Sequence, residues 1–223
     1  AYADTDWGYS SAHEWGKLNH NYAACNGAYQ SPINIDKTIP AIMQPLQFSY
    51  NTMIQAIQNN GHTIQVDFSE GGVLYLDGDQ FVLKQFHLHS PSENLIKGKS
   101  YPLEIHFVHA NAKGELAVVG MMYAAGIENP QLARMWNSLP KQKGQKTLLA
   151  QPQPVNNLLP KNLQYYRFSG SLTTPPCSEG VRWIIMKEIQ YASEQQIRQF
   201  SELMGHPNNR PVQPLNGRII AEN

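Results

Sequence analysis

The sequence predicts a mainly β domain, on the basis of three observations. Several segments alternate apolar and polar side chains with a period of two residues, which is typical of strands with one buried face. The 16 glycines and 15 prolines are spread along the 223 residues, as expected where many short strands are joined by turns. No repeat, low-complexity tract or linker-like change of composition interrupts the sequence, so we expect one domain over residues 1–223.

The strand predictions begin at residues 63–68, whose apolar side chains share one face. Residues 73–76 and 81–84 then flank a turn at 77–79, which is the pattern of a β-hairpin. Three further strands are continuously apolar in parts, as expected of central strands covered on both faces. These strands comprise residues 101–109, 116–123 and 181–187.

Helical patterns are few, and residues 193–205 form the clearest one. Ser193 is suited to cap the N-terminus, Gln196 follows three residues later as in a capping box, and Gly205 is suited to end the helix. Residues 129–139 predict a second helix.

Composition and charge exclude several classes of protein. The 17 Lys and Arg residues balance the 17 Asp and Glu residues, and only 15% of the residues are charged. We therefore expect no nucleic-acid partner, no polybasic membrane surface and no highly charged disordered chain. The longest nearly apolar stretch, residues 116–127, is shorter than the roughly 18 residues of a membrane span, so we expect no membrane association.

The two cysteines, Cys25 and Cys177, are too few for a cysteine-rich zinc site. Two buried thiols and one disulfide are both compatible with the sequence, and a disulfide would indicate an oxidising compartment. The small residues Ala1 and Ala3 resemble the tail of a cleaved signal peptide, although a chain end of another origin explains them equally well.

Three of the eight histidines have the spacing of a metal site. A strand sends residues i and i+2 to one face, so His87 and His89 project together. A loop over residues 90–100 lets the next strand return antiparallel and places His106 opposite this pair. Three neutral imidazoles leave one tetrahedral position open, which is the arrangement of catalytic zinc sites. Imidazole ligands suit zinc, with copper, iron and cobalt as alternatives.

Two polar residues are suited to support these ligands. Gln85 and Glu104 each precede a candidate ligand by two residues on the same face, where a partner for the second imidazole N–H is expected. The alternative is that both simply line a wet cleft. The remaining histidines lack this spacing, and His109 is predicted to point away from His106. They are His13, His20, His62, His109 and His206.

A second metal motif also fits part of this region. The pattern His87-x-His89-x-x-x-Glu93 with a later histidine is similar to that of the cupins, β-barrels that bind iron or manganese. In a cupin, Glu93 would be a metal ligand. The cupin pattern expects glycines where this sequence has Phe81 and Ser100, so this alternative is disfavoured.

Seven segments, in order and at matching spacing, resemble the α-class carbonic anhydrases, in particular the secreted bacterial subgroup. The resemblance extends from Trp7 to near Arg218 and implies a single domain around a large twisted, mostly antiparallel central sheet with a few short peripheral helices. Zinc would lie at the bottom of a conical cleft. The segments are residues 30–35, 59–62, 85–89, 92–93, 104–109, 170–177 and 209–215.

The resemblance implies reversible hydration of carbon dioxide to bicarbonate and a proton, by attack of zinc-bound hydroxide. It makes His62 the proton shuttle, Thr173 the residue that orients the hydroxide, and Glu93 the acceptor of the Thr173 hydrogen bond. Zinc lowers the pKa of bound water to about 7, and histidine titrates near that pH. The zinc ligands implied are His87, His89 and His106.

The resemblance also indicates residues around the substrate. Thr174 would contact bicarbonate, although capping a turn is an alternative role. Carbon dioxide would rest against four apolar residues, for which plain core packing is the alternative: Val108, Val118, Leu172 and Trp183. Waters on the proton path would be ordered by Tyr9, Asn60 and Gln65.

The resemblance finally favours a Cys25–Cys177 disulfide and a periplasmic or secreted protein, because secreted and bacterial members carry a disulfide at matching places. Members of the bacterial subgroup often dimerise, so we expect a homodimer. Sulfonamides and inorganic anions are the expected inhibitors. A non-enzymatic alternative is a carbonic-anhydrase-like binding module, but such modules typically lose a zinc ligand, and all three are present here.

Overall fold

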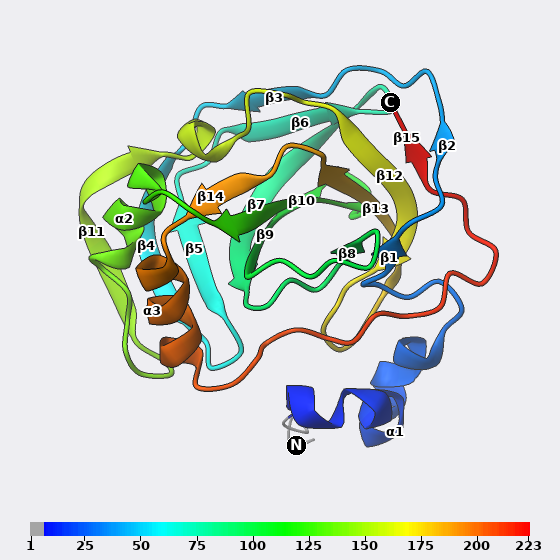
Figure 1. Cartoon of the computed structure of the whole chain (residues 1–223), viewed down its shortest axis with the longest axis horizontal. Helices are drawn as coiled ribbons and strands as arrows, with labels where there is room; N and C mark the ends of the chain where they lie inside the picture. Colours follow the sequence, from blue (N-terminus) through cyan, green and yellow to red (C-terminus); the bar gives the residue numbers. More distant parts are fainter. Residues whose placement is uncertain (1–6) are drawn as a thin grey trace.

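The computed structural model describes residues 7–223, so Ala1 and Ala3 lie outside the described residues. Strands dominate, and they form a large mixed sheet in which most neighbours are antiparallel (Figure 1). The predicted mainly β fold is confirmed. Across the main sheet the strands run in the order β11 (Lys146–Pro154), β4 (Met53–Asn59), β5 (Ile64–Phe68), β7 (Asp79–His89), β9 (Leu103–Ala110), β10 (Leu116–Ala125), β13 (Glu179–Met186), β12 (Tyr165–Ser171), β15 (Ala221–Glu222) and β2 (Ile39–Pro40).

Shorter elements surround this sheet. β3 (Gln47–Tyr50) pairs with β6 (Gly72–Leu76), β6 pairs with β7, and β14 (Gln190–Ala192) pairs with β10. A separate small sheet joins β1 (Asn34–Ile35) to β8 (Leu95–Ile96). The helices are α1 (Trp15–Leu18), α2 (Pro130–Trp136) and α3 (Glu194–Met204), with 3-10 segments η1 (Tyr9–Glu14), η2 (His20–Asn26) and η3 (Val155–Leu158).

The predicted hairpin is β6–β7. Leu76 pairs with Asp79 across a two-residue turn, and both turn residues have positive φ, 53° at Asp77 and 71° at Gly78. Asp-Gly is a sequence that tolerates this left-handed turn, whose twist matches that of the flanking strands. β7 then continues into the centre of the sheet, where it carries the metal-ligand candidates.

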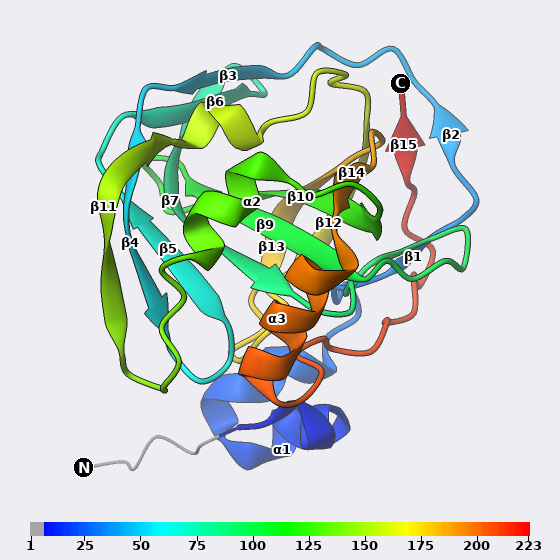
Figure 2. The same cartoon turned by 60° about the vertical axis from the view of Figure 1, so that its left-hand side comes forward.

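The central strands are buried on both faces, as predicted. Along β9, Ile105 and Phe107 belong to one apolar cluster and Val108 belongs to another, because alternate side chains point to opposite faces. Figure 2 shows α2 and α3 covering one face of the sheet, and Leu132 and Phe200 from these helices join the cluster of Ile105. The face that carries Val108 also carries His106.

Both predicted helices are present. In α3, the Ser193–Gln196 capping box is formed, and Gly205 ends the helix with a φ of 73°. α2 is shorter than the predicted 129–139, beginning at Pro130 after the capping residue Asn129. Within residues 7–223, none of the helices has the length and apolar character needed to cross a membrane.

Candidate metal centre

The three candidate ligands meet on neighbouring strands. His87 of β7 pairs directly with His106 of β9, and His89 lies two residues farther along β7. One nitrogen of each imidazole lies within 4.8 Å of the others. His89 and His106 are 1% exposed, whereas His87 is half-buried. The strand prediction for this site is therefore confirmed in its geometry.

Two of the imidazoles are held by the residues predicted to support them. His87 Nδ1 lies 2.8 Å from Gln85 Oε1, and His106 Nε2 lies 2.8 Å from Glu104 Oε2. Because these oxygens can only accept, each imidazole donates there and keeps a lone pair on its other nitrogen. The lone pairs are those of His87 Nε2 and His106 Nδ1.

The third imidazole is oriented by a backbone group. His89 Nδ1 donates to the Asn208 carbonyl at 2.7 Å, which leaves the lone pair of Nε2 directed at the site. This Nε2 is buried and has no hydrogen-bond partner among the described residues. Burial lowers the pKa of His87 and His89, so both are neutral, as metal ligands must be. Three such nitrogens in a buried recess fit zinc.

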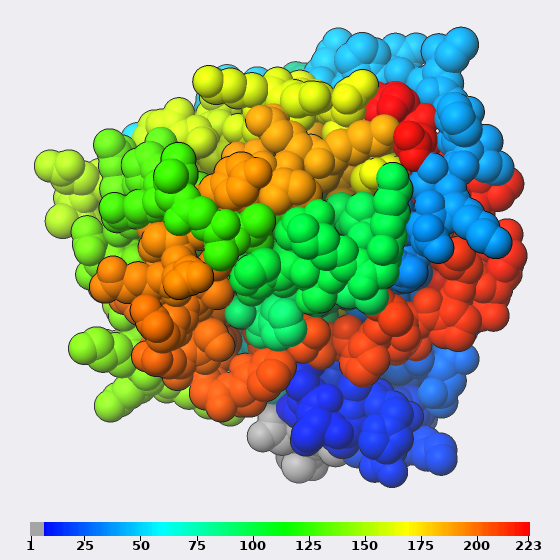
Figure 3. All heavy atoms as spheres, in the orientation of Figure 1, coloured from blue at the N-terminus to red at the C-terminus, as the bar shows by residue number. Residues whose placement is uncertain are grey.

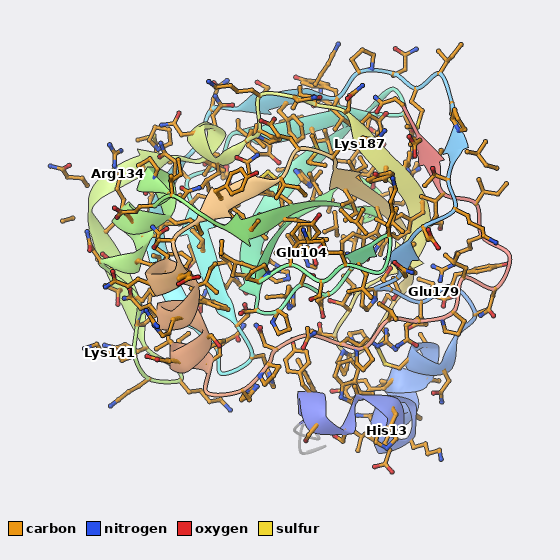
Figure 4. All side chains as sticks on the ribbon, in the orientation of Figure 1. His13, Glu104, Arg134, Lys141, Glu179 and Lys187 are labelled. Atoms are coloured by element: carbon orange, nitrogen blue, oxygen red, sulfur yellow. A yellow bond between two sulfur atoms is a disulfide. The ribbon has the colours of Figure 1, made fainter. Side chains whose placement is uncertain are left out.

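Glu104 is a fully buried carboxylate that connects the ligand strand to the following loop. Its oxygens accept from the backbone N–H groups of Glu93 and Asn94 at 2.8 and 3.0 Å, in addition to His106. Burial raises the pKa of Glu104, but His106 and Asn94 outweigh this effect, so the net pKa is lowered. Figure 4 shows Glu104 at the centre of the molecule. A Cβ at Gly120 would lie 3.0 Å from Glu104 Oε2, so only glycine leaves ordinary room there.

Glu93 lies beside the ligands without joining them. Its Oε1 is 3.2 Å from His89 Nε2, and its Oε2 accepts from the Arg210 N–H at 2.8 Å. Burial raises the pKa of Glu93 to about 7, against the opposing effects of His106, Arg210 and Thr173. Glu93 Oε1 has no partner of full hydrogen-bond geometry within residues 7–223, yet the Thr173 hydroxyl lies close enough to lower this pKa. A cation at the site would favour the ionised carboxylate further.

His62 lies on a turn at the rim of a cavity of about 590 Å³. The Asn60 side-chain oxygen accepts from the backbone N–H groups of His62 and Thr63, both at 2.9 Å, so Asn60 holds the turn. The His62 ring stacks on Trp7, with centroids 3.7 Å apart. Tyr9 lines the same cavity, and burial, followed by the charge of Glu93, raises its pKa.

Gln65 lies closer to the ligands, because it is the β5 neighbour of His87 in the sheet. The structure therefore brings Tyr9 to the cavity, Asn60 to the turn that carries His62, and Gln65 to the ligand strands.

The four residues predicted to contact carbon dioxide belong to one apolar cluster. Val108, Val118 and Trp183 are buried, and Leu172 packs against them. The Trp183 ring lies 5.0 Å from that of His106, so the cluster borders the candidate metal site.

The loop that carries Thr173 is covalently attached to the N-terminal segment. Cys25 and Cys177 form a disulfide, which decides between the two alternatives that the sequence left open. The Thr174 carbonyl accepts from the Cys177 N–H at 2.9 Å and closes the turn. The Arg210 guanidinium donates to the carbonyl of Cys25, so this segment is anchored from a second side.

The other histidines divide into three environments. His13 and His20 are exposed on the N-terminal segment, and Figure 4 shows His13 at the periphery. His109 is buried on the opposite face from His106, as predicted, where it contacts Tyr50 and the Ala117 carbonyl. His206, to which no role was assigned from its spacing, lines the cavity with His62.

Comparison with known proteins agrees with this geometry. The model of the eukaryotic-type carbonic anhydrase family matches residues 10–223. A carbonic anhydrase of Pectobacterium atrosepticum is 50% identical over 218 residues, which cover 96% of this chain and 89% of that protein.

Solved structures agree as well. The α-carbonic anhydrase of Photobacterium profundum superimposes with a TM-score of 0.93 at 47% identity, covering 97% of this chain and 100% of that one. That of Thermovibrio ammonificans, in complex with the inhibitor sulfanilamide, superimposes with a TM-score of 0.96 at 45% identity, covering 98% and 100%. With its three imidazoles on adjacent strands and a match over nearly its whole length, this chain belongs to the α-class, or eukaryotic-type, carbonic anhydrase family.

Proposed function

We propose that this protein is a zinc-dependent carbonic anhydrase, which hydrates carbon dioxide reversibly to bicarbonate and a proton. The observation that carries this proposal is the set of three imidazoles whose second nitrogens are already held by acceptors, so that three lone pairs meet in one recess. The family to which the chain belongs supports the reaction.

Zinc bound by His87, His89 and His106 would supply a Lewis acid that ionises water near neutral pH. The chain's own contribution is to keep these ligands neutral and oriented. Carbon dioxide is apolar, and the cluster beside His106 offers it an apolar surface. The residues of that surface are Val108, Val118, Leu172 and Trp183.

Thr173 and Glu93 are proposed to orient the nucleophile. An ionised Glu93 can only accept, so Thr173 donates its hydroxyl proton to it. The Thr173 oxygen then presents a lone pair to the nucleophile, which aligns the nucleophile's own lone pair with the carbon of the substrate. Thr174 is proposed to contact the bicarbonate product on the same loop.

His62 is proposed to take the proton released by hydration and to pass it to solvent. Its position in the lining of the cavity supports this role, because the residue is half-buried and so is accessible to solvent. Tyr9 and Gln65 are proposed to order waters on the way, and Asn60 is proposed to keep the His62 turn in place.

Stopped-flow hydration of carbon dioxide, followed with a pH indicator, tests the function. We expect fast proton release that a chelator abolishes and that added zinc restores. Zinc-loaded protein without activity would indicate a binding module instead. Hydration activity that iron or manganese restores and zinc does not would contradict the assigned metal. A sulfonamide should inhibit the hydration, as the inhibitor complex of the Thermovibrio relative suggests.

We also propose a cellular location, a domain organisation and an oligomeric state for the enzyme. The Cys25–Cys177 disulfide supports an oxidising compartment, and we propose a periplasmic or secreted protein. We also propose one domain over residues 1–223 and a homodimer, the latter from the likeness to the bacterial subgroup. Sedimentation equilibrium tests the dimer, and a mass equal to one chain at all concentrations would exclude it.

A further inference from the structure

A second histidine shares the cavity rim with His62. The cavity is lined by residues from four distant segments, and Trp7, His62 and His206 are among them. Resting on the proposed function, we infer that His206 is a second proton-transfer residue, which accepts protons from the cavity water and delivers them to solvent in parallel with His62.

The local backbone fixes His206 at this rim. The chain leaves α3 through Gly205, whose positive φ turns it toward the cavity. Two residues beyond His206, the Asn208 carbonyl holds His89, and the Asn208 amide donates to the His62 carbonyl at 3.1 Å. One short segment therefore positions His206 relative to both the metal centre and the His62 turn. Figure 3 shows the segment that follows α3, in orange-red, next to the blue N-terminal segment.

The tautomer of His206 suits proton acceptance. Its Nδ1 lies 3.0 Å from the Pro207 carbonyl, which can only accept, so Nδ1 carries the hydrogen and Nε2 has the lone pair. The side chain is exposed, so a proton gained at Nε2 can leave to a buffer base. In each cycle Nε2 gains one proton from cavity water and then loses it to the buffer base, which regenerates the neutral ring without electron transfer.

Tyr9 connects the rim to the interior. Its ring lies 6.3 Å from that of His206, and its hydroxyl is close enough to the metal centre for the charge of Glu93 to act on it. A neutral phenol can both donate and accept, so it can order a water chain between the two places. The other titratable groups facing this cavity are His62 and Lys143. The positive charge of Lys143 favours release of protons to solvent over their accumulation.

The test compares His62→Ala, His206→Gln and the double variant by stopped-flow hydration at low and high buffer concentration. If the two histidines transfer protons in parallel, His206→Gln alone should lower kcat less than twofold. Adding His206→Gln to His62→Ala should lower kcat at low buffer by about a further tenfold. The value of kcat/KM should not change, because it reports the carbon chemistry, and added imidazole should restore kcat. His13→Gln is the matched control at an exposed site away from the cavity, with no effect expected.

Two results would contradict a proton-transfer role for His206. A double variant with the same kcat as His62→Ala at low buffer would overturn the role of His206. So would a loss of kcat/KM or of bound zinc in His206→Gln, because either would indicate a merely structural role through Asn208. If wild-type protein shows no zinc-dependent hydration, the proposed function itself fails. If His62→Ala leaves kcat unchanged, only the shuttle role of His62 fails, and a buffer-dependent defect in His206→Gln would still support His206.

Discussion

Glu104 joins two parts of the metal centre through one carboxylate. One oxygen holds the His106 imidazole, and the other holds the backbone of Glu93, so a ligand and the proposed partner of Thr173 share a single anchor. Both oxygens of this buried carboxylate accept hydrogen bonds, which is the condition under which a buried charge is tolerated. Glu104 therefore orients the His106 imidazole and raises its basicity as a metal ligand.

We expect Glu104→Gln to weaken zinc binding by about 10- to 100-fold, the usual effect of removing such a partner. The amide keeps the size of the side chain but removes the negative charge that favours donation by His106. Equilibrium competition with a zinc chelator measures the change. Glu115→Gln is a matched control, because Glu115 is an exposed carboxylate that bonds Arg182 and Asn111 away from the site. Zinc affinity equal to that of the wild type in Glu104→Gln would contradict the role.

At the scale of elements, the pairing of β7 with β9 accounts for what the sequence could predict. Alternation places His87, His89 and Gln85 on one face of β7, and the register places His106 opposite. The same periodicity predicted the two strands of the β6–β7 hairpin. The turn between them was predicted from the Asp-Gly pair, because such turns have a specific backbone geometry. Periodicity and turn chemistry depend only on residues close together in the chain, so both can be recognised in a single sequence.

Contacts between distant segments could not be predicted in this way. The partner of His89 is the backbone carbonyl of Asn208, 119 residues away, and any residue type supplies a carbonyl. His206 lies in a loop without periodicity, so its place beside the His62 cavity depends on the complete fold. The roles of His62, Thr173 and Glu93 came from resemblance, because isolated hydroxyl, carboxylate and turn residues have many uses.

For the whole molecule, the sheet separates a polar site from a large apolar core. His106 points to the face with the metal centre, whereas His109, three residues later, points into the cluster that α2 and α3 cover. There it accepts from the Tyr50 hydroxyl and donates to the Ala117 carbonyl, so both ring nitrogens are used by the neutral form. Protonation of His109 would bury a charge in this core.

We therefore expect His109 to make global stability pH-dependent. Burial lowers its pKa to about 4 in the folded protein, whereas a histidine in an unfolded chain titrates near 6.5. Between these values the unfolded state binds a proton that the folded state does not, so the stabilisation is present above about pH 6.5 and is lost as the pH falls toward 4. Over this pH range the contribution of His109 to the free energy of unfolding falls by about 3 kcal/mol.

Urea unfolding of metal-free protein between pH 4.5 and 7 measures this effect. His109→Gln should be less stable than the wild type at pH 7, yet its unfolding free energy should fall less steeply with decreasing pH. Because His87 and His89 also have lowered pKa values and titrate in both proteins, the difference between the two slopes isolates His109. His20→Gln, on the exposed N-terminal segment, should keep the wild-type slope. Equal slopes for the wild type and His109→Gln would mean that the ring can be protonated in place, and that the apolar core admits enough water to solvate it.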